Sequence, residues 1–451
     1  MQTPSLVVRS RRVIGPHSSG PASVHISGGI ITAIEPYESI PDGVPTIDAG
    51  ESVLMPGLID THVHLNDPGR THWEGFYTGT RAAAAGGITA LVDMPLNSIP
   101  ATTTLAGLRA KLAAAAGNCW VDTGLWGGVV PGNADQIGPL FDAGVRGFKC
   151  FLVPSGVEEF GHVTEADLRA ALPRLAECGA VLLAHAELPG PIEAARVSGS
   201  GRAYPTWLAS RPRAAENQAI EMLIRLCREF HARIHIVHLS SSEAVPLLQR
   251  AKEDGLPVTV ETCPHYLCFT AEEIPDGATE FKCAPPIRES ENRERLWDAL
   301  AEGVIDLIAS DHSPCPPGMK CCESGDFLRA WGGIASVQVS LAAVWSQARG
   351  RGYGPERIAA WMSSGPARLA GLEHRKGSIE VGHDADLVIW DPNSALPSPL
   401  TLHHRHKLTP YEGRTRLHGV VQQTILRGET IFDRGVFPAT PAGRMLLRGS
   451  H

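Results

Sequence analysis

The order of apolar and polar positions divides the chain into two kinds of segment. Near the start, short strand-like runs alternate with turn residues at 6–9, 24–27 and 30–34, a pattern typical of a small β-unit. After residue 54, apolar strand-like runs alternate with amphipathic or alanine-rich helical stretches. Strand signals without intervening helices return at 385–432, so we expect the two chain ends to build one β-unit together.

In the middle of the chain, candidate strands and helices alternate as they do in a barrel. Candidate strands lie at 57–65, 89–95, 120–130, 147–153, 180–187, 233–240, 257–266 and 305–314. Candidate helices lie at 103–116, 164–178, 216–231, 242–254, 292–302, 334–347 and 355–370. Eight strands with intervening helices predict a (β/α)8 barrel. A doubly wound sheet would need a glycine-rich nucleotide loop after its first strand, and the sequence has none there.

We therefore expect an α/β protein with two units. Residues 54–377 should form the (β/α)8 barrel, and residues 1–53 and 378–447 should form a small β-sandwich from both chain ends. The last four residues, 448–451, resemble a remnant of an affinity tag and are left out of the fold prediction.

Composition and charge narrow the class of protein. With 43% hydrophobic and 20% charged residues, the chain is neither disordered nor fibrous. A net charge of -8 without a basic block argues against nucleic acid or an anionic membrane as partner. No apolar run approaches the roughly 18 residues of a membrane span, and the first residues lack the apolar core of a signal peptide. We predict a cytoplasmic protein that acts on a small molecule.

The ten cysteines predict reduced thiols in a reducing compartment, because they are scattered and form no CxxC pair. Cys321 and Cys322 are adjacent, and we expect them to be reactive loop thiols.

Histidines recur where the predicted strands end, and in a barrel those ends meet on one face. His62 and His64 end the first strand, and their spacing of two points both side chains to the same side, as for two ligands of one metal ion. Asp60 lies on that side too and could orient a ligand. The alternative is a strand pair without function.

Three more strands add residues to this face. His185 ends the fifth strand and His238 the sixth, while His235 lies three positions earlier and faces the opposite side. Asp311 follows the eighth strand, where an acidic residue serves either as a helix cap or as a ligand or base. Each residue alone could be structural, but together they favour a metal centre.

Lys149 lies within a short apolar strand, where a charged ammonium is costly unless it is paired or discharged. One interpretation is a side chain that snorkels to the surface or forms a buried salt bridge. The other is a neutral amine that captures CO2 as a carbamate, whose two oxygens can bridge two metal ions.

Longer motifs give the chain a specific resemblance. They lie at 68–75, 93–97, 100–102, 147–151, 263–266, 311–317, 330–334, 405–407 and 410–414. With these motifs the chain resembles the metal-dependent amidohydrolase superfamily and, within it, the cyclic amidohydrolases with a carboxylated lysine, above all the allantoinase family. The resemblance runs nearly end to end. It implies an enzyme that opens the hydantoin ring of allantoin to allantoate in purine catabolism, as a homotetramer.

The resemblance also implies ligand roles. His62, His64 and Asp311 would hold a buried metal ion, and His185 and His238 a more exposed one. Lys149, as N6-carboxylysine, would bridge both ions together with a hydroxide. Zinc is the expected metal, with cobalt, iron, nickel and manganese as alternatives. Asp311 would also act as the catalytic base and then as the acid.

Substrate contacts are implied by the same motifs. Ala284, Ser313, Trp331, Gly332 and Asn97 are the candidates. Dihydroorotases resemble the chain less, because they place an arginine where this sequence has Asn66. Hydantoinases and dihydropyrimidinases carry a tyrosine shortly after the bridging lysine, whereas residues 151–155 contain none. They remain the main alternative. A mononuclear deaminase would not need Lys149, and a non-catalytic scaffold would have lost ligands.

Overall fold

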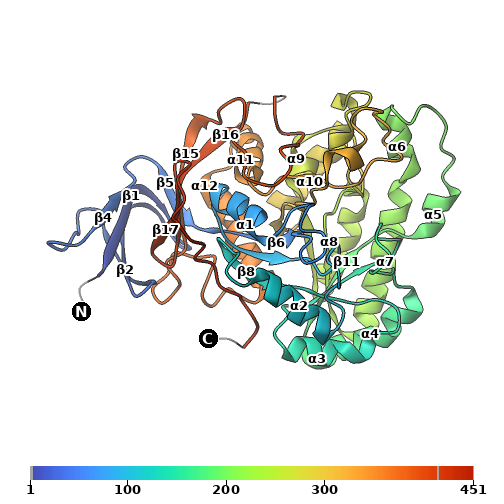
Figure 1. Cartoon of the computed structure of the whole chain (residues 1–451), viewed down its shortest axis with the longest axis horizontal. Helices are drawn as coiled ribbons and strands as arrows, with labels where there is room; N and C mark the ends of the chain where they lie inside the picture. Colours follow the sequence, from blue (N-terminus) through green and yellow to red (C-terminus); the bar gives the residue numbers. More distant parts are fainter. Residues whose placement is uncertain (1–3, 414–415, 450–451) are drawn as a thin grey trace.

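The computed structural model describes residues 4–413 and 416–449. The two chain ends form one mixed sheet, visible in Figure 1 as blue and red strands side by side at one end of the molecule. Its order is β17-β16-β15-β5-β1-β2-β3, and β4 pairs with β1. The strands are β1 (Leu6–Ile14), β2 (Ser19–Ser27), β3 (Ile30–Pro36), β4 (Thr46–Asp48), β5 (Val53–Pro56), β15 (Leu387–Ala395), β16 (His418–Leu426) and β17 (Glu429–Asp433). Branched side chains such as Val8, Leu54 and Ile389 pack into a core of their own.

The remaining strands in the described part of the chain are parallel. They are β6 (Leu58–Val63), β7 (Ile88–Asp93), β8 (Asp122–Leu125), β9 (Gly127–Gly128), β10 (Phe148–Phe151), β11 (Val181–His185), β12 (Arg233–Ile236), β13 (Val258–Thr262) and β14 (Leu307–Ile308). Pairing runs β6-β7-β8 and β9-β10-β11-β12-β13-β14.

Two short links close these two sheets into a ring. Only Trp126 separates β8 from β9, so both are pieces of one strand. After β14, His312 forms a parallel bridge with Val63 of β6, and the His64 N–H donates to the His312 carbonyl over 2.8 Å. The predicted (β/α)8 barrel is confirmed. The carboxyl ends of its strands lie on one face.

Helices surround the barrel (Figure 1). They are α1 (Phe76–Ala85), α2 (Leu105–Ala115), α3 (Ile137–Asp142), α4 (Glu165–Cys178), α5 (Pro189–Ala194), α6 (Tyr204–Ser210), α7 (Arg213–Phe230), α8 (Val245–Glu253), α9 (Pro264–Cys268), α10 (Ser290–Ala301), α11 (Ser340–Gly350), α12 (Pro355–Ala359) and α13 (Gly365–Ala370). In α7 the buried positions Ala219, Leu223 and Cys227 recur every four residues and form the face toward the strands.

Several boundaries differ from the sequence prediction for local reasons. The run 257–266 does not stay extended: after β13, Pro264 starts α9, because proline fits the first turn of a helix. The predicted helix 334–347 begins only at Ser340, since Ile334 is still bridged to His312. The run 305–314 is not one continuous strand: β14 covers two residues, and pairing resumes at His312, which bridges Val63 and Ile334.

Candidate metal centre

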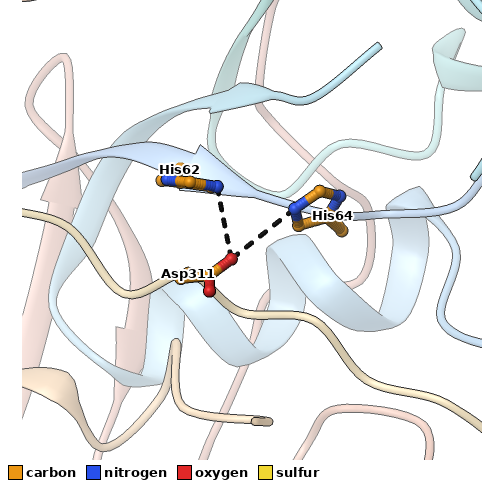
Figure 2. A group of neighbouring side chains, drawn as sticks. All are labelled: His62, His64 and Asp311. Carbon is orange, nitrogen blue, oxygen red and sulfur yellow. Dashed lines mark ion pairs between the residues drawn. The ribbon is translucent and has the colours of Figure 1, made fainter. Parts of the chain in front are cut away.

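The carboxyl ends of the barrel strands bring the predicted histidines together with Asp311. In Figure 2, His62 and His64 both point to the Asp311 carboxylate, which approaches from the segment after β14. Oδ1 of Asp311 lies 3.2 Å from His62 Nε2 and 3.6 Å from His64 Nε2. All three side chains are buried, and they form a group that could hold a metal ion.

The second pair of histidines completes the cluster. The ring centroids of His185 and His238 lie 4.6 Å apart, and those of His238 and His62 lie 5.4 Å apart. His235 lies on the other side of its strand, where its Nε2 is 3.0 Å from Glu261 and its Nδ1 is 2.8 Å from Thr259. The structure therefore places His238, and not His235, beside the other candidate ligands.

The backbone is strained where it delivers two of these residues. His238 and Asp311 have φ angles of 41° and 46°, in the left-handed region that residues other than glycine rarely adopt. Such conformations cost about 1–3 kcal/mol each and concentrate at functional sites. The fold thus holds both side chains in positions that ordinary strand geometry would not provide.

Burial also sets the protonation state of the imidazoles. It lowers the pKa of His64 to about 4, and it lowers the pKa of His185 and of His238 as well. These rings are neutral at neutral pH, and neutral imidazole has the free nitrogen lone pair that binds a metal ion. Burial alone would raise the pKa of Asp311, but His62, His64 and His238 lower it below its usual range.

Lys149 brings a buried amine to the centre. Its side chain is fully buried on β10, and its Nζ has no hydrogen-bond partner among the described residues. Burial lowers the pKa of its amine to about 8, and a charged Lys149 would lower the pKa values of His64, His185 and His238. A buried amine whose pKa is lowered toward neutrality, and which has no hydrogen-bond partner among the described residues, fits a group that is completed by CO2 and metal ions.

Glu261 is a residue of the centre that sequence reasoning missed. Its Oε1 lies 2.5 Å from His62 Nδ1, on the side of the ring away from Asp311. Burial alone would raise the pKa of Glu261, but hydrogen bonds and charge interactions with His62 and His235 lower it to about 2. A carboxylate on the second ring nitrogen fixes the orientation of a ligating histidine.

A carboxylate supports His185 in the same way, whereas His64 has an amide donor beside its Nδ1. Glu187 Oε2 lies 2.7 Å from His185 Nε2, and the Asn97 amide nitrogen lies 3.5 Å from His64 Nδ1. Asp60, by contrast, does not contact an imidazole: its Oδ1 accepts the main-chain N–H groups of His62 and Ser310, which ties β6 to the segment before Asp311.

We expect the Glu261→Gln substitution to weaken metal binding about 10- to 100-fold, because it removes the anion that orients His62. Competition with a chromophoric chelator would measure the affinity. Asp60→Asn is the matched control, since it neutralises a buried carboxylate near the same histidine that contacts the His62 main chain and Ser310 but no imidazole. An equal loss of affinity in both variants would contradict the assignment.

A cavity of about 440 Å³ opens over the cluster. The five predicted substrate contacts all line it: Asn97, Ala284, Ser313, Trp331 and Gly332. Trp331 packs edge-on against Trp73, with ring centroids 4.9 Å apart. The turn after it needs Gly333, because a Cβ there would lie 2.4 Å from the Ser313 carbonyl oxygen.

Other lining residues were not predicted. Phe151 stacks on His185 with centroids 4.6 Å apart, and Trp207, Arg211 and Lys282 form a further part of the wall. Cys321 also lines the cavity, while Cys322 is exposed, and their reactivity stays a prediction. Of the motif 410–414, residue 414 lies outside the described residues, as do the first three residues and the last two of the predicted tag remnant.

In the described part of the chain, no helix combines the length and the apolar character required to cross a membrane.

Fold and site together define a (β/α)8-barrel protein with a histidine and aspartate cluster at the carboxyl ends of its strands. The sequence model of the amidohydrolase family matches residues 53–431, and the chain belongs to this family. It is 52% identical over 450 residues to a protein named allantoinase from Streptomyces avermitilis, covering 99% of this chain and all of that one. An allantoinase from Arabidopsis thaliana is 45% identical over 98% of this chain and 90% of its own length.

A solved structure agrees with the fold. The L-hydantoinase (dihydropyrimidinase) from Arthrobacter aurescens superposes with a TM-score of 0.92 at 31% identity, over 98% of this chain and all of that one. The resemblance inferred from the sequence motifs is therefore confirmed at the level of the family and the fold.

Proposed function

We propose that the protein is an allantoinase, which hydrolyses a cyclic amide bond in the hydantoin ring of allantoin and gives allantoate. The observation that carries the proposal is the near full-length similarity to allantoinases, at 52% identity to the Streptomyces avermitilis protein. A hydantoinase or dihydropyrimidinase is the second candidate, favoured by the hydantoinase structure at 31% identity. The reaction would belong to the breakdown of purines.

The donor set fits two divalent metal ions. His62, His64 and Asp311 would hold one, His185 and His238 the other, and Lys149 carrying a CO2-derived carbamate would bridge them. Zinc is the expected metal, with cobalt, iron, nickel and manganese as alternatives. When bound, such ions supply hydroxide at neutral pH and polarise the amide carbonyl.

The residues of the chain would then handle the proton and the orientation of the ring. Asp311, ionised at neutral pH, takes the proton of the attacking water and gives it to the ring nitrogen as the C–N bond breaks. Ala284, Ser313, Trp331, Gly332 and Asn97 would bind the ring. Phe151 stacks on the imidazole of His185 and covers one face of it.

A substrate panel on protein of known metal content tests the proposal. We expect the highest kcat/KM for allantoin among allantoin, hydantoin, dihydrouracil and dihydroorotate, with two metal ions per chain after loading in bicarbonate. Faster turnover of hydantoin or dihydrouracil would move the function to the second candidate. One metal ion per chain would favour a deaminase, and no hydrolysis after loading would favour a scaffold.

Assembly and compartment belong to the same proposal. The resemblance predicts a homotetramer in the cytoplasm. Light scattering of the purified protein and fractionation of cells that express it would test these two points.

A further inference from the structure

One wall of the cavity carries two cations on a single indole ring. Trp207 on α6 is fixed by a hydrogen bond from its indole N–H to the Cys283 carbonyl over 3.2 Å. Arg211 Cζ lies 5.4 Å and Lys282 Nζ lies 4.3 Å from the centroid of this ring. All three residues line the cavity over the metal centre. Cations over an aromatic face are stabilised by the quadrupole of the ring. The indole of Trp207 therefore helps to hold both cations in this wall.

The two cations differ in the hydrogen-bond donors that remain available for a ligand. The Lys282 ammonium donates to the main-chain carbonyls of Ala330 over 2.6 Å and Leu328 over 3.2 Å, and its side chain is buried. Its role is to hold the segment that leads into Trp331. The Arg211 guanidinium donates to Glu187 Oε2 over 2.7 Å, and within residues 4–413 and 416–449 it has no other hydrogen-bond acceptor. Guanidinium has five N–H donors, so Arg211 keeps donors for a ligand in the cavity.

The position of Arg211 relative to the metal centre is defined by Glu187. The same oxygen, Oε2, lies 2.7 Å from His185 Nε2 and 2.7 Å from Arg211 Nη1. A single carboxylate, that of Glu187, therefore contacts both Arg211 and the candidate metal ligand His185. Arg211 also lines the cavity over the histidine and aspartate cluster, so a substituent on a substrate ring held at the cluster can meet its guanidinium.

We propose that Arg211 is a specificity-determining residue, which donates hydrogen bonds to the carbonyl oxygen of a ureido substituent on the substrate ring. The inference deepens the proposed function and rests on it. Allantoin carries such a substituent, whereas hydantoin has only hydrogen at that ring carbon. A charge-assisted hydrogen bond to a carbonyl favours the substituted ring, and a site built to make it rejects the analogue without the group.

The experiment compares two substrates on the metal-loaded protein. Arg211→Gln should lower kcat/KM for allantoin about 10- to 100-fold relative to that for hydantoin, mainly through KM, as expected when one hydrogen bond to a charged group is lost. If hydantoin binds but is not hydrolysed, its inhibition constant is measured against allantoin. This constant then takes the place of the kcat/KM of hydantoin in the comparison. Arg211→Lys keeps the charge and should restore part of the ratio. A ratio that stays at the wild-type value in both variants overturns the proposal.

Two further variants separate specificity from support of the metal centre. Glu187→Gln breaks the link between His185 and Arg211 but leaves the guanidinium, so both substrates should lose activity together. Arg213→Gln is the matched control, because Arg213 pairs with Asn292 and Glu289 and does not line the cavity. A wild-type protein that does not hydrolyse allantoin refutes the proposed function, whereas one that does, with an unchanged ratio in Arg211→Gln, refutes this inference alone.

Discussion

Replacing Lys149 by alanine should lower kcat at least about a thousandfold and reduce the metal content of the purified protein. The side chain of Lys149 is fully buried near the histidine cluster and its Nζ has no hydrogen-bond partner among the described residues, which agrees with the proposed bridging carbamate. Loss of a bridging ligand removes several kcal/mol of metal-derived stabilisation, and each 1.4 kcal/mol is about tenfold in rate.

Metal analysis together with activity per metal ion checks this prediction. Lys376→Met is the matched control: Lys376 is equally buried but pairs with Asp122, Asp384 and Asp386, far from the cavity lining. It should lower the stability of the fold and leave kcat of the metal-loaded, folded protein at the wild-type value. Labelled bicarbonate gives a direct view of the carbamate. A fully active, fully metallated protein with an unmodified Lys149 would contradict the assignment.

The candidate ligands could be predicted from the sequence because their geometry is local. A spacing of two places His62 and His64 on one side of a strand, and the three-residue offset separates His235 from His238. The barrel rule then brings strand ends that are far apart in sequence to one face. These steps need only periodicity and topology, which the apolar pattern of the chain already contains.

The supporting residues could not be predicted, because their contacts depend on how different strands meet. Glu261 reaches His62 across 199 positions of sequence, and nothing in the run 257–266 marks its carboxylate as different from a surface residue. Asp60 was the local alternative, and it contacts main chain because its side chain lies under the strand junction. Arg211 lies in the short connection between α6 and α7, whose path is set by packing.

Replacing Asp311 by asparagine should lower kcat about 10²- to 10⁴-fold, the contribution of a positioned general base. Asparagine has nearly the same shape and keeps an oxygen where Oδ1 lies between His62 and His64, but it cannot take a proton from water. KM should change much less than kcat, because the substituted atom acts on the reacting proton and not on the bound ring. Steady-state kinetics on allantoin would measure both constants.

The rate must be expressed per metallated site, because Asp311 has two roles in the proposal. If its carboxylate only held a metal ion, Asp311→Asn protein reloaded to the wild-type metal content would regain the wild-type kcat. If it moves the proton, the reloaded variant stays slow. Asp306→Asn is the control, since Asp306 lies five residues earlier and pairs with Lys252 and the Val260 N–H outside the cavity. The kcat of Asp306→Asn should remain at the wild-type value. A low kcat in Asp311→Asn alone then assigns the base to Asp311 and excludes an effect of the net charge of the segment.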